Sequence, residues 1–355
     1  MENEEQKEHY VQYKFIADPG QSALRIDKFL VDRIEGVTRN RVQSAIDEGK
    51  VYVNGKTVKS NYKVRPLDDI KVIVFDEPKI YEVKPENIPL DVVYEDEDLM
   101  IINKVAGMAV HPGVGNYTGT LSNALAHYLG DDILKGNRHP YLVHRIDMNT
   151  SGLLLVAKNE DAMSFLSAQF RAHTTVRKYL ALTWGTFQNR EGTIEGNIAR
   201  NPKNRMAFSV VGEGGKHATT HYTVLEEFVF TSLIECQLET GRTHQIRVHM
   251  KHFGHPLFND EKYGGSRIRK GVVFAKYKSF VENCFKLLPR HALHAKSLGF
   301  IHPTSKEYVH FDSELPADFQ NVLDKWRSVN EAYSFDSDHP DLQDRGTTNE
   351  SDLAI

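Results

Sequence analysis

The sequence predicts an α+β protein with two folded parts. A small module of two helices and a hairpin precedes a larger domain with a mixed, largely antiparallel sheet and flanking helices. Three observations support this class. The strand-like segments of the larger part are not separated by the regular helical crossovers of a doubly wound parallel sheet. An Asn-Gly pair near the N-terminus separates two β-branched runs, and an acidic stretch with three prolines divides the two parts.

The small module is expected over residues 19–76. Its first segment has apolar residues at helical spacing, which are Ile26, Phe29, Leu30 and Ile34. Thr38 is the predicted N-cap of a second helix, which stops at Gly49. Asn54 and Gly55 predict a tight hairpin turn, and the run D-D-I-K-V-I-V-F predicts a closing strand.

The other boundaries follow from composition. We expect residues 1–18 to be a flexible N-terminal segment and residues 77–92 to be the linker. The larger domain is expected over residues 93–328, where strands and helices are mixed. Residues 329–355 are polar and acidic with few large apolar side chains, which predicts a disordered tail.

Composition excludes several classes of protein. The chain has 355 residues, of which 40% are hydrophobic and 26% charged, as in ordinary globular proteins. No apolar stretch approaches the ~20 residues of a membrane span, and the N-terminus is too acidic for a signal peptide. The two cysteines, Cys236 and Cys284, are far apart in the sequence, which argues against a disulfide scaffold and fits the cytoplasm. We expect Cys236 to be a buried small hydrophobe.

The net charge of −4 is unevenly distributed. Residues 20–75 contain 11 basic and 7 acidic side chains, and residues 96–310 contain 26 basic and 19 acidic ones. The two expected folded parts are therefore basic, whereas the tails and the linker are acidic. A basic body suits a phosphate backbone. Charge by itself does not decide between RNA binding and an ordinary solvated surface.

The densest polar cluster is H-R-I-D-M-N-T-S-G-L-L-L-V-A-K, residues 144–158. Here Asp147 lies in a short polar loop that leads into a buried strand, where a scaffold can present one carboxylate. Alternatively, Asp147 only accepts turn hydrogen bonds, with Asn149, Thr150 and Ser151 as its loop partners. The local pattern leaves both interpretations open and slightly favours the second.

A second cluster is L-E-T-G-R-T-H-Q-I-R-V-H-M-K-H. Alternation predicts a strand with Arg247 and His249 on one face, and an inward-pointing arginine needs a carboxylate because an unpaired buried guanidinium is very costly. Four histidines invite a metal interpretation: His244, His249, His252 and His255. Their spacing fits no common zinc pattern, so we expect polar or RNA-facing roles and no metal site.

Three further motifs complete the set. The run N-K-V-A-G-M-A-V-H-P covers residues 103–112, and R-H-A-L-H-A-K-S-L-G-F-I-H-P covers residues 290–303. Between them, R-K-Y-L-A-L-T-W-G places Tyr179 before an alternating strand. Taken alone, such a tyrosine is more often a core aromatic with a satisfied hydroxyl.

Four of these runs, at residues 103–112, 144–158, 241–249 and 290–303, follow one another in family order and resemble the RluA-type RNA pseudouridine synthases. The small module is similar to the RNA-binding module named after a small-subunit ribosomal protein, and this pairing is typical of the RluD-like branch, which acts on large-subunit ribosomal RNA. The chain has Ile146 and Ile246 where the family usually has Leu, and His291 where Gln is common. The first two changes are conservative, and the third puts a peripheral contact in doubt.

The resemblance implies roles by motif position. The implied catalytic residues are Asp147, Tyr179 and Arg247. In this assignment Asp147 is the catalytic carboxylate, Arg247 pairs with it and Tyr179 packs on the target base. The implied substrate-binding residues are His144 and Arg145 at the pocket mouth and Ile246 in the base pocket. In the small module, the residues that we expect to hold RNA phosphates on one exposed side are Arg39, Arg41 and Lys50.

We therefore expect an enzyme that isomerises specific uridines in structured RNA, most of all large-subunit ribosomal RNA. The reaction adds no group and changes no oxidation state, so we expect no cofactor. We also expect no membrane association and no obligate protein partner. The main alternative is a non-catalytic RNA-binding ribosome-assembly factor with a dormant site. A metal-dependent RNA hydrolase using the histidines is a third and weaker hypothesis.

Overall fold

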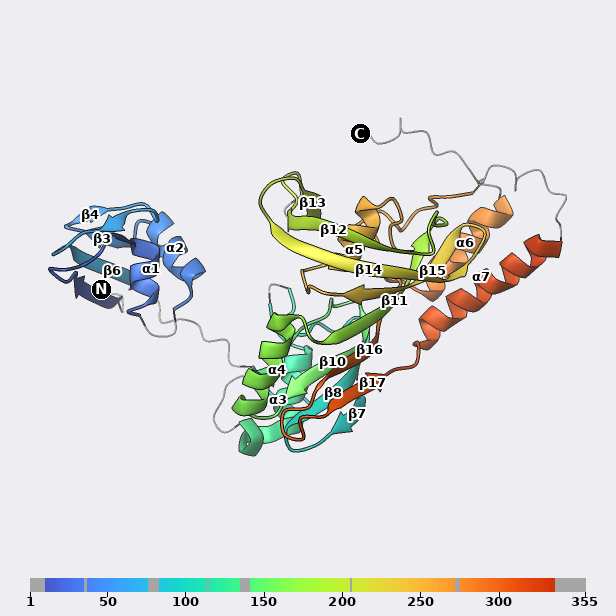
Figure 1. Cartoon of the computed structure of the whole chain (residues 1–355), viewed down its shortest axis with the longest axis horizontal. Helices are drawn as coiled ribbons and strands as arrows, with labels where there is room; N and C mark the ends of the chain where they lie inside the picture. Colours follow the sequence, from blue (N-terminus) through green and yellow to red (C-terminus); the bar gives the residue numbers. More distant parts are fainter. Residues whose placement is uncertain are drawn as a thin grey trace, which may run out of the picture. The chain divides into compact units, whose positions relative to one another are not determined.

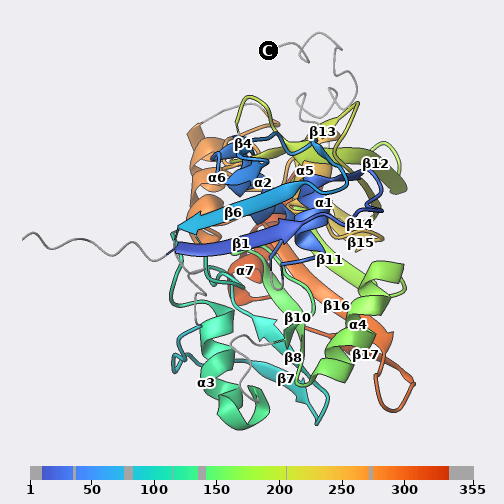
Figure 2. The ribbon, with the colours of Figure 1, turned by 90° about the vertical axis from the view of Figure 1, so that its left-hand side faces the viewer.

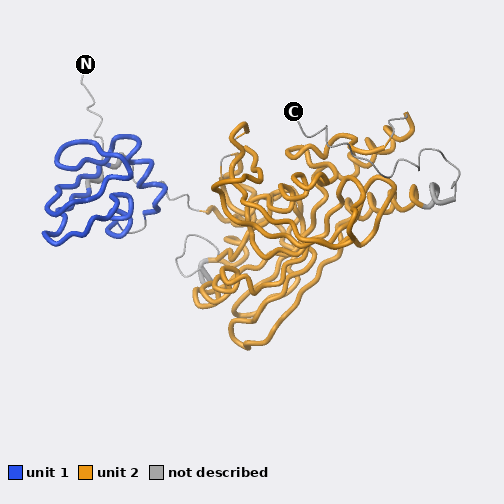
Figure 3. Tube along the Cα trace, turned by 45° about the horizontal axis from the view of Figure 1, so that its top comes forward, with its two compact units in different colours: residues 1–81 blue, residues 82–355 orange. Residues whose placement is uncertain are grey.

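A computed structural model of the chain describes residues 10–34, 37–75, 83–113, 115–134, 141–204, 206–271 and 275–335. The chain divides into two compact units, Met1–Tyr81 and Glu82–Ile355, which are shown in different colours in Figure 3. Each unit has its own buried apolar core. Two units with separate cores are the arrangement that the acidic, proline-containing stretch predicts.

The small unit combines two helices with short antiparallel strands. Its elements are β1 (Tyr10–Ile16), β2 (Leu24–Arg25), α1 (Ile26–Val31), α2 (Arg39–Asp47), β3 (Val51–Val53), β4 (Lys56–Thr57), β5 (Lys63–Val64) and β6 (Asp69–Phe75). Its main sheet has the order β1-β6-β3-β4, and β2 pairs with β5. The four apolar side chains of the predicted first helix are buried in one cluster, but α1 ends at Val31, so Ile34 packs there from beyond the helix.

Local signals in the small unit are confirmed as well. The Thr38 side chain accepts a hydrogen bond from the backbone N–H of Arg41 at the start of α2. Asn54 and Gly55 both adopt positive φ angles, 50° and 78°, and connect β3 to β4. Two consecutive left-handed residues match the twist of a two-residue hairpin, and Asn-Gly tolerates them best.

The expectation of a flexible segment over residues 1–18 is wrong for Tyr10–Ile16. These residues form strand β1, which pairs antiparallel with β6 from Tyr10 opposite Phe75 to Ile16 opposite Asp69. The partner strand lies some fifty residues later, so the local sequence gives little sign of it.

The large unit is built on one extended sheet. Its strands are β7 (Val92–Glu95), β8 (Leu99–Lys104), β9 (Tyr141–Leu142), β10 (Ser151–Ala157), β11 (Val176–Trp184), β12 (Glu191–Arg200), β13 (Phe208–Val211), β14 (Lys216–Glu227), β15 (Thr231–Leu238), β16 (Leu293–Ile301) and β17 (Tyr308–Asp312). The order along the sheet is β13-β12-β14-β15-β11-β16-β10-β8-β7, with β17 on β16 and β9 on β10. Among the described strands only β10 and β16 pair in parallel, so the predicted mixed, largely antiparallel sheet is confirmed.

Five helices of the described part flank this sheet: α3 (Leu121–Leu134), α4 (Glu160–Ala172), α5 (Gln245–His252), α6 (Ala275–Leu287) and α7 (Ala317–Phe335). Helices α3 and α4 lie beside the part of the sheet that contains β7, β8 and β10 (Figures 1 and 2), and α4 contacts β10 and β16. Helix α5 contacts β12, β13 and β14 at the other end of the sheet, and α6 packs on α7. Strands β10, β16 and β11 are adjacent between these two groups of helices.

Two expected boundaries differ from the structure. Part of the expected linker, 77–92, packs on the large unit, because Val83 is buried in its core and β7 begins at Val92. Helix α7 reaches Phe335, so residues 329–335 of the expected disordered tail are helical. The rest of that tail, residues 336–355, lies outside the described residues. Among the described helices, none is both long and apolar enough to cross a bilayer.

Gly152 permits the close approach of β10 and β16. The parallel pairing places Gly152 opposite Ala295, and Gly152 has a φ of 109°. A Cβ atom at this position would lie 2.2 Å from the backbone oxygen of Ala295. Only glycine combines this backbone angle with such a short approach.

We predict that Gly152→Ala lowers the free energy of unfolding by at least ~3 kcal/mol, because the methyl group meets backbone rather than a movable side chain. Urea unfolding followed by circular dichroism measures the effect. Gly212→Ala is the matched control, since a Cβ there meets nothing within 4 Å, and it should change stability by less than about 0.5 kcal/mol. Equal stability of the two variants would refute this account of the strand junction.

Candidate active site

A cavity of about 510 Å³ opens in the large unit. It is bordered by the loop before β10, by β11 and by the segment that leads into α5. Five arginines line it, and Asp147 contributes the only carboxylate among the lining residues. A volume of this size accommodates a small organic ligand such as a nucleoside.

Asp147 is held by a buried arginine. Arg247 donates from Nη1 to Asp147 Oδ2 over 2.9 Å. The opposite edge of the same guanidinium is bidentate to Asp260, with Nε–Oδ2 and Nη2–Oδ1 distances of 2.7 and 2.9 Å. The Asp260 side chain is fully buried, whereas the Asp147 side chain is 17% exposed. The arginine is thus fixed on its buried side and presents its free edge to the carboxylate at the cavity.

Sequence reasoning identified the need for a carboxylate near Arg247 but missed Asp260. Asp260 follows the short run P-L-F-N and precedes two glycines, and nothing local distinguishes it from an ordinary loop aspartate. The signal was indirect, since a buried guanidinium implies more than one acceptor.

The strand predicted around Arg247 is wrong. Gln245–His252 form helix α5, and all residues from Gln245 to Met250 are buried. In a helix buried on every side, polar and apolar residues can alternate without marking two faces. His249 therefore does not share an exposed face with Arg247: it is fully buried, and its Nδ1 lies 3.0 Å from Thr220 Oγ1.

The surroundings of Asp147 keep it ionised. Burial opposes ionisation, but the charges of His244 and Arg247 bring the pKa of Asp147 below its ordinary value. Burial lowers the pKa of His244 to about 4, so this imidazole is neutral at pH 7. At neutral pH the charge that keeps Asp147 deprotonated is therefore that of Arg247.

His244 and Tyr263 pack beside the ion pair of Asp147 and Arg247. The guanidinium carbon Cζ of Arg247 lies 5.0 Å from the centroid of the Tyr263 ring. The Tyr263 hydroxyl accepts a hydrogen bond from the backbone N–H of Phe208. His244 Nδ1 is 2.7 Å from that hydroxyl, and its Nε2 is 4.0 Å from Asp147 Oδ2. These contacts orient the guanidinium and fill the space beside it.

Tyr179 lies on β11, and its ring lines the cavity. It is 8% exposed and sits between Cys236 of β15 and Ala295 of β16 in the sheet. Its hydroxyl has no hydrogen-bond partner among the described residues, unlike a core tyrosine with a satisfied hydroxyl. Burial raises the pKa of Tyr179, while the nearby Arg177 charge acts in the opposite direction.

A buried lysine fastens the loop that carries Asp147. Lys104 is 2% exposed, and its Nζ donates to the backbone oxygens of Val105, Met108 and Met148 over 2.7, 2.9 and 3.0 Å. Burial and the charge of Arg290 lower the pKa of Lys104 to about 7. The three carbonyl acceptors match the three N–H donors of the ammonium form, which we therefore take as the bound species.

The other side of the loop is tied to the segment before β16. Arg290 pairs with Asp318 over 2.7 Å and donates to the backbone oxygen of Asn149. Thr150 Oγ1 lies 2.9 Å from His291 Nε2, and Ser151 Oγ lies 2.9 Å from His294 Nδ1. The Thr150 and Ser151 side chains therefore bond to histidines, and the loop leaves the Asp147 carboxylate to Arg247.

The residues expected at the cavity mouth differ in their environments. His144 Nε2 accepts the backbone N–H of Leu155, and its ring stacks on Phe170 with centroids 4.7 Å apart. Burial lowers the pKa of His144 to about 3, so the ring is neutral and engaged within the protein. Arg145 is exposed and lines the cavity, and Ile246 is buried in its wall.

The small-unit arginines are not equivalent. Arg39 forms an ion pair of 2.8 Å with the fully buried Asp27, and this contact anchors α2 to α1. Lys50 pairs with Glu48. Arg41 is exposed, and no side-chain bond is formed by it among the described residues. Of the three expected phosphate contacts, Arg41 is thus the cation least engaged within the protein.

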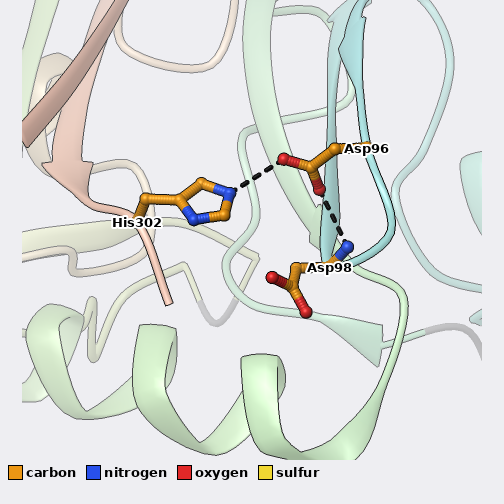
Figure 4. Close-up of side chains that lie close together, drawn as sticks. All are labelled: Asp96, Asp98 and His302. Atoms are coloured by element: carbon orange, nitrogen blue, oxygen red, sulfur yellow. Dashed lines mark hydrogen bonds and ion pairs between the residues drawn. The ribbon is translucent and has the colours of Figure 1, made fainter. Parts of the chain in front are cut away.

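One group of possible metal ligands occurs among the described residues, formed by Asp96, Asp98 and His302 (Figure 4). His302 Nε2 lies 2.8 Å from Asp96 Oδ2, and its Nδ1 accepts two backbone N–H groups. Asp96 Oδ1 accepts the backbone N–H of Asp98 and of the residue after it. Both Asp98 oxygens are hydrogen-bonded as well, to Asn159 and Thr304. The group is a hydrogen-bonded joint between the β7–β8 and β16–β17 turns.

The family of the chain is indicated by two profile matches. A profile described as RNA pseudouridylate synthase matches residues 98–252, and one described as S4 domain matches residues 24–70. The first match contains Asp147, Tyr179 and Arg247, and the second covers both helices of the small unit.

Individual proteins agree with these matches. An uncharacterised RNA pseudouridine synthase of Chlorobaculum parvum is 46% identical over 315 residues, which cover 87% of this chain and 96% of that protein. A protein of Zymomonas mobilis named ribosomal large subunit pseudouridine synthase D is 42% identical, over 83% of this chain and 92% of its own. Among solved structures, human RNA pseudouridylate synthase domain containing 1 has a TM-score of 0.51 and 26% identity, and covers 75% of this chain and 99% of its own.

Removal of the Asp260 charge tests the ion triad formed by Asp147, Arg247 and Asp260. We predict that Asp260→Asn lowers the free energy of unfolding by roughly 3–5 kcal/mol, because a buried guanidinium loses its bidentate partner. Asp312→Asn is the control, since Asp312 pairs with Lys296 at a side chain that is 51% exposed, and its loss should cost less than about 1 kcal/mol. Thermal unfolding of both variants measures the difference, and equal losses would rule out a special role for the buried pair.

Proposed function

The chain belongs to the RNA pseudouridylate synthase family and isomerises uridine to pseudouridine in RNA, and we propose that large-subunit ribosomal RNA is its substrate. The 42% identical relative named for the large ribosomal subunit supports this substrate, as does the S4 domain. The basic composition of both units agrees with an RNA ligand. We further propose that the protein works in the cytoplasm, where its two free, buried cysteines would stay reduced.

We assign the catalytic carboxylate to Asp147, and the observation that carries this assignment is its 2.9 Å contact with Arg247 at the cavity. Isomerisation breaks the bond between ribose C1′ and uracil N1, turns the base and rejoins it through C5. An ionised carboxylate either attacks C1′ or removes a proton from C2′. In both routes the electron pair of the broken bond goes to the uracil ring.

We propose that Tyr179 contacts the face of the target base and that Ile246 contacts its edge. The aromatic ring offers a stacking surface to a base extracted from the RNA. The Tyr179 hydroxyl, which has no protein partner among the described residues, is available to relay the proton that leaves C5 to a base or to water. Apolar Ile246 excludes water from the same pocket.

Contacts to the RNA backbone are proposed for exposed cations. Arg145 lies at the exposed edge of the cavity, next to the internally bonded His144. In the small unit we propose Arg41 as a phosphate contact, with Arg39 and Lys50 as weaker candidates because both have carboxylate partners. The alternative, an RNA-binding assembly factor with a dormant site, is opposed by the intact pair of Asp147 and Arg247.

We predict that Asp147→Asn slows tritium release from [5-³H]uridine-labelled ribosomal RNA by a factor of at least ~10³. RNA affinity should stay within about twofold, because an amide of the same shape replaces one carboxylate. Tyr179→Phe is the companion variant and should slow tritium release without weakening RNA binding. Turnover by the Asp147→Asn variant at the wild-type rate would exclude this carboxylate from the reaction.

The pKa values of the groups at the site predict how the rate in the same assay depends on pH. The pKa of Asp147 is lowered, so the reactive ionised form is fully populated above its ordinary pKa and is lost only as the pH falls below it. His244 and His291, with pKa values lowered to about 4 and about 3 by burial, stay neutral over the same window. The single-turnover rate constant should therefore be flat with respect to these groups from pH 8 to about pH 5.

The salt dependence of RNA binding tests whether the small unit contacts phosphates. We predict that Arg41→Gln weakens binding to ribosomal RNA by about two- to tenfold and reduces the slope of log affinity against log salt by about 1. Filter binding at several salt concentrations measures both. Lys14→Gln removes an exposed charge from β1 of the same unit and serves as the control. An unchanged slope for Arg41→Gln would show that this side chain does not meet a phosphate.

A further inference from the structure

Arg177 is a buried arginine that pairs with no carboxylate among the described residues. It lies on β11, is 6% exposed and lines the cavity two residues before Tyr179, on the same side of the strand. Its Nη2 donates to the backbone oxygens of Leu238 and Glu239 over 3.3 and 2.8 Å. Its Nε is buried and has no hydrogen-bond partner among the described residues. Its Nη1, which also has none there, is not enclosed in the same way.

This arrangement sets Arg177 apart from the other buried arginines of the large unit. Arg247 is paired with two carboxylates, and Arg290 is paired with Asp318. Burial lowers the pKa of Arg177, but a guanidinium still stays charged at neutral pH. A buried cation without an adjacent carboxylate is costly, and its position at a cavity implies an anion that the bound ligand carries or acquires.

The charges around the cavity indicate which anion this is. Arg247 faces both Asp147 and Asp260, so this cluster has one net negative charge. The neighbouring His144 and His244 are neutral at pH 7, because burial lowers their pKa values to about 3 and about 4. Among the buried side chains that line the cavity, the positive charge of Arg177 therefore balances the net negative charge of this cluster. The triad itself has no excess positive charge that could neutralise a second anion.

The reaction itself moves one negative charge. Whether Asp147 forms an ester with C1′ or takes the C2′ proton, its carboxylate loses its charge, and the departing uracil gains the electron pair of the C1′–N1 bond. The anion thus moves from the Arg247 side of the cavity to the base. Tyr179, which we assign to the base, lies on the same strand as Arg177, so the detached ring would be next to that guanidinium.

We propose that Arg177 is a base-binding residue that stabilises the anionic uracil ring by donating from its guanidinium to a uracil oxygen. The proposal rests on the proposed function, but it holds for either route of bond cleavage. RNA phosphates are a less suitable partner for so buried a group, since exposed Arg145 and Arg171 line the same cavity nearer to solvent. When C5 bonds to C1′, the negative charge returns to the Asp147 carboxylate and the ring becomes neutral. The C5 proton is then replaced by a proton on N1, so the ring stays neutral and the contact weakens.

Binding of small molecules tests this without turnover. Barbiturate resembles uracil in size and carbonyl pattern but is an anion at neutral pH. The Asp147→Asn protein, whose amide mimics a carboxylate that has lost its charge, should bind barbiturate on the order of tenfold more tightly than uracil in calorimetric titrations. The ionised Asp147 of the wild type should reduce this preference. Adding Arg177→Met to Asp147→Asn should abolish this preference, and adding Arg177→Lys should keep part of it. Adding Arg171→Met, which removes an exposed arginine from the same cavity, should leave the preference intact. Absence of a barbiturate preference in folded Asp147→Asn protein would overturn the proposal whether or not the double variants fold.

Single-turnover kinetics distinguish a contact of Arg177 with the base from a contact with RNA phosphates. With saturating RNA, Arg177→Met should lower the single-turnover rate constant of tritium release by about tenfold to a hundredfold, with RNA affinity within about twofold. The loss should be the same on RNA with neutral methylphosphonate linkages on both sides of the target uridine. A loss that appears as weaker binding and vanishes on methylphosphonate RNA would assign Arg177 to a phosphate and overturn the proposal. Wild-type inactivity on ribosomal RNA would instead refute the proposed substrate, which the barbiturate titration does not involve.

Discussion

The guanidinium of Arg247, held between two carboxylates, is the constraint on which the site depends. Its bidentate contact with Asp260 satisfies the buried edge, and the remaining Nη1 can then point only toward Asp147. Each of these ions would be unstable in the interior without the others, so the three positions are mutually determined. The fully buried carboxylate neutralises the arginine, and the partly exposed one stays ionised and accessible. The first is structural and the second reactive because of this difference in burial.

The scaffold around the triad serves to hold a polar loop still. Lys104 at the end of β8 binds the Met148 backbone, and Arg290 in the segment before β16 binds the Asn149 backbone. The turn beyond Asp147 is thus tied to two separate segments of the unit. Gly152 then lets β10 approach β16 more closely than any other residue would permit. Polar groups in this loop thus exchange water for fixed protein donors, which makes the position of the carboxylate independent of substrate binding.

Sequence reasoning worked where the determining contacts are local and failed where they are distant. The Asn54-Gly55 turn follows from backbone preference, and the carboxylate partner of Arg247 follows from the cost of burying an arginine. Asp260 and β1 were missed because their importance comes from partners that the local pattern does not contain. Helix α5 was mistaken for a strand because a helix buried all round has no polar face to mark its period. The role of Arg177 depends on which carboxylates are absent around it, and no motif encodes that.

The position of β16 in the sheet has a consequence for the newly made protein. This strand is almost the last in the sequence, Leu293–Ile301, yet it lies between β10 and β11, which carry or follow the reactive groups. A ribosome-bound chain that ends before residue 293 lacks the strand that joins the two halves of the sheet. Such non-local pairing forms slowly and only once both partners are available. We therefore expect the pocket to stay unassembled throughout most of translation, so that a nascent chain without β16 has no active pocket.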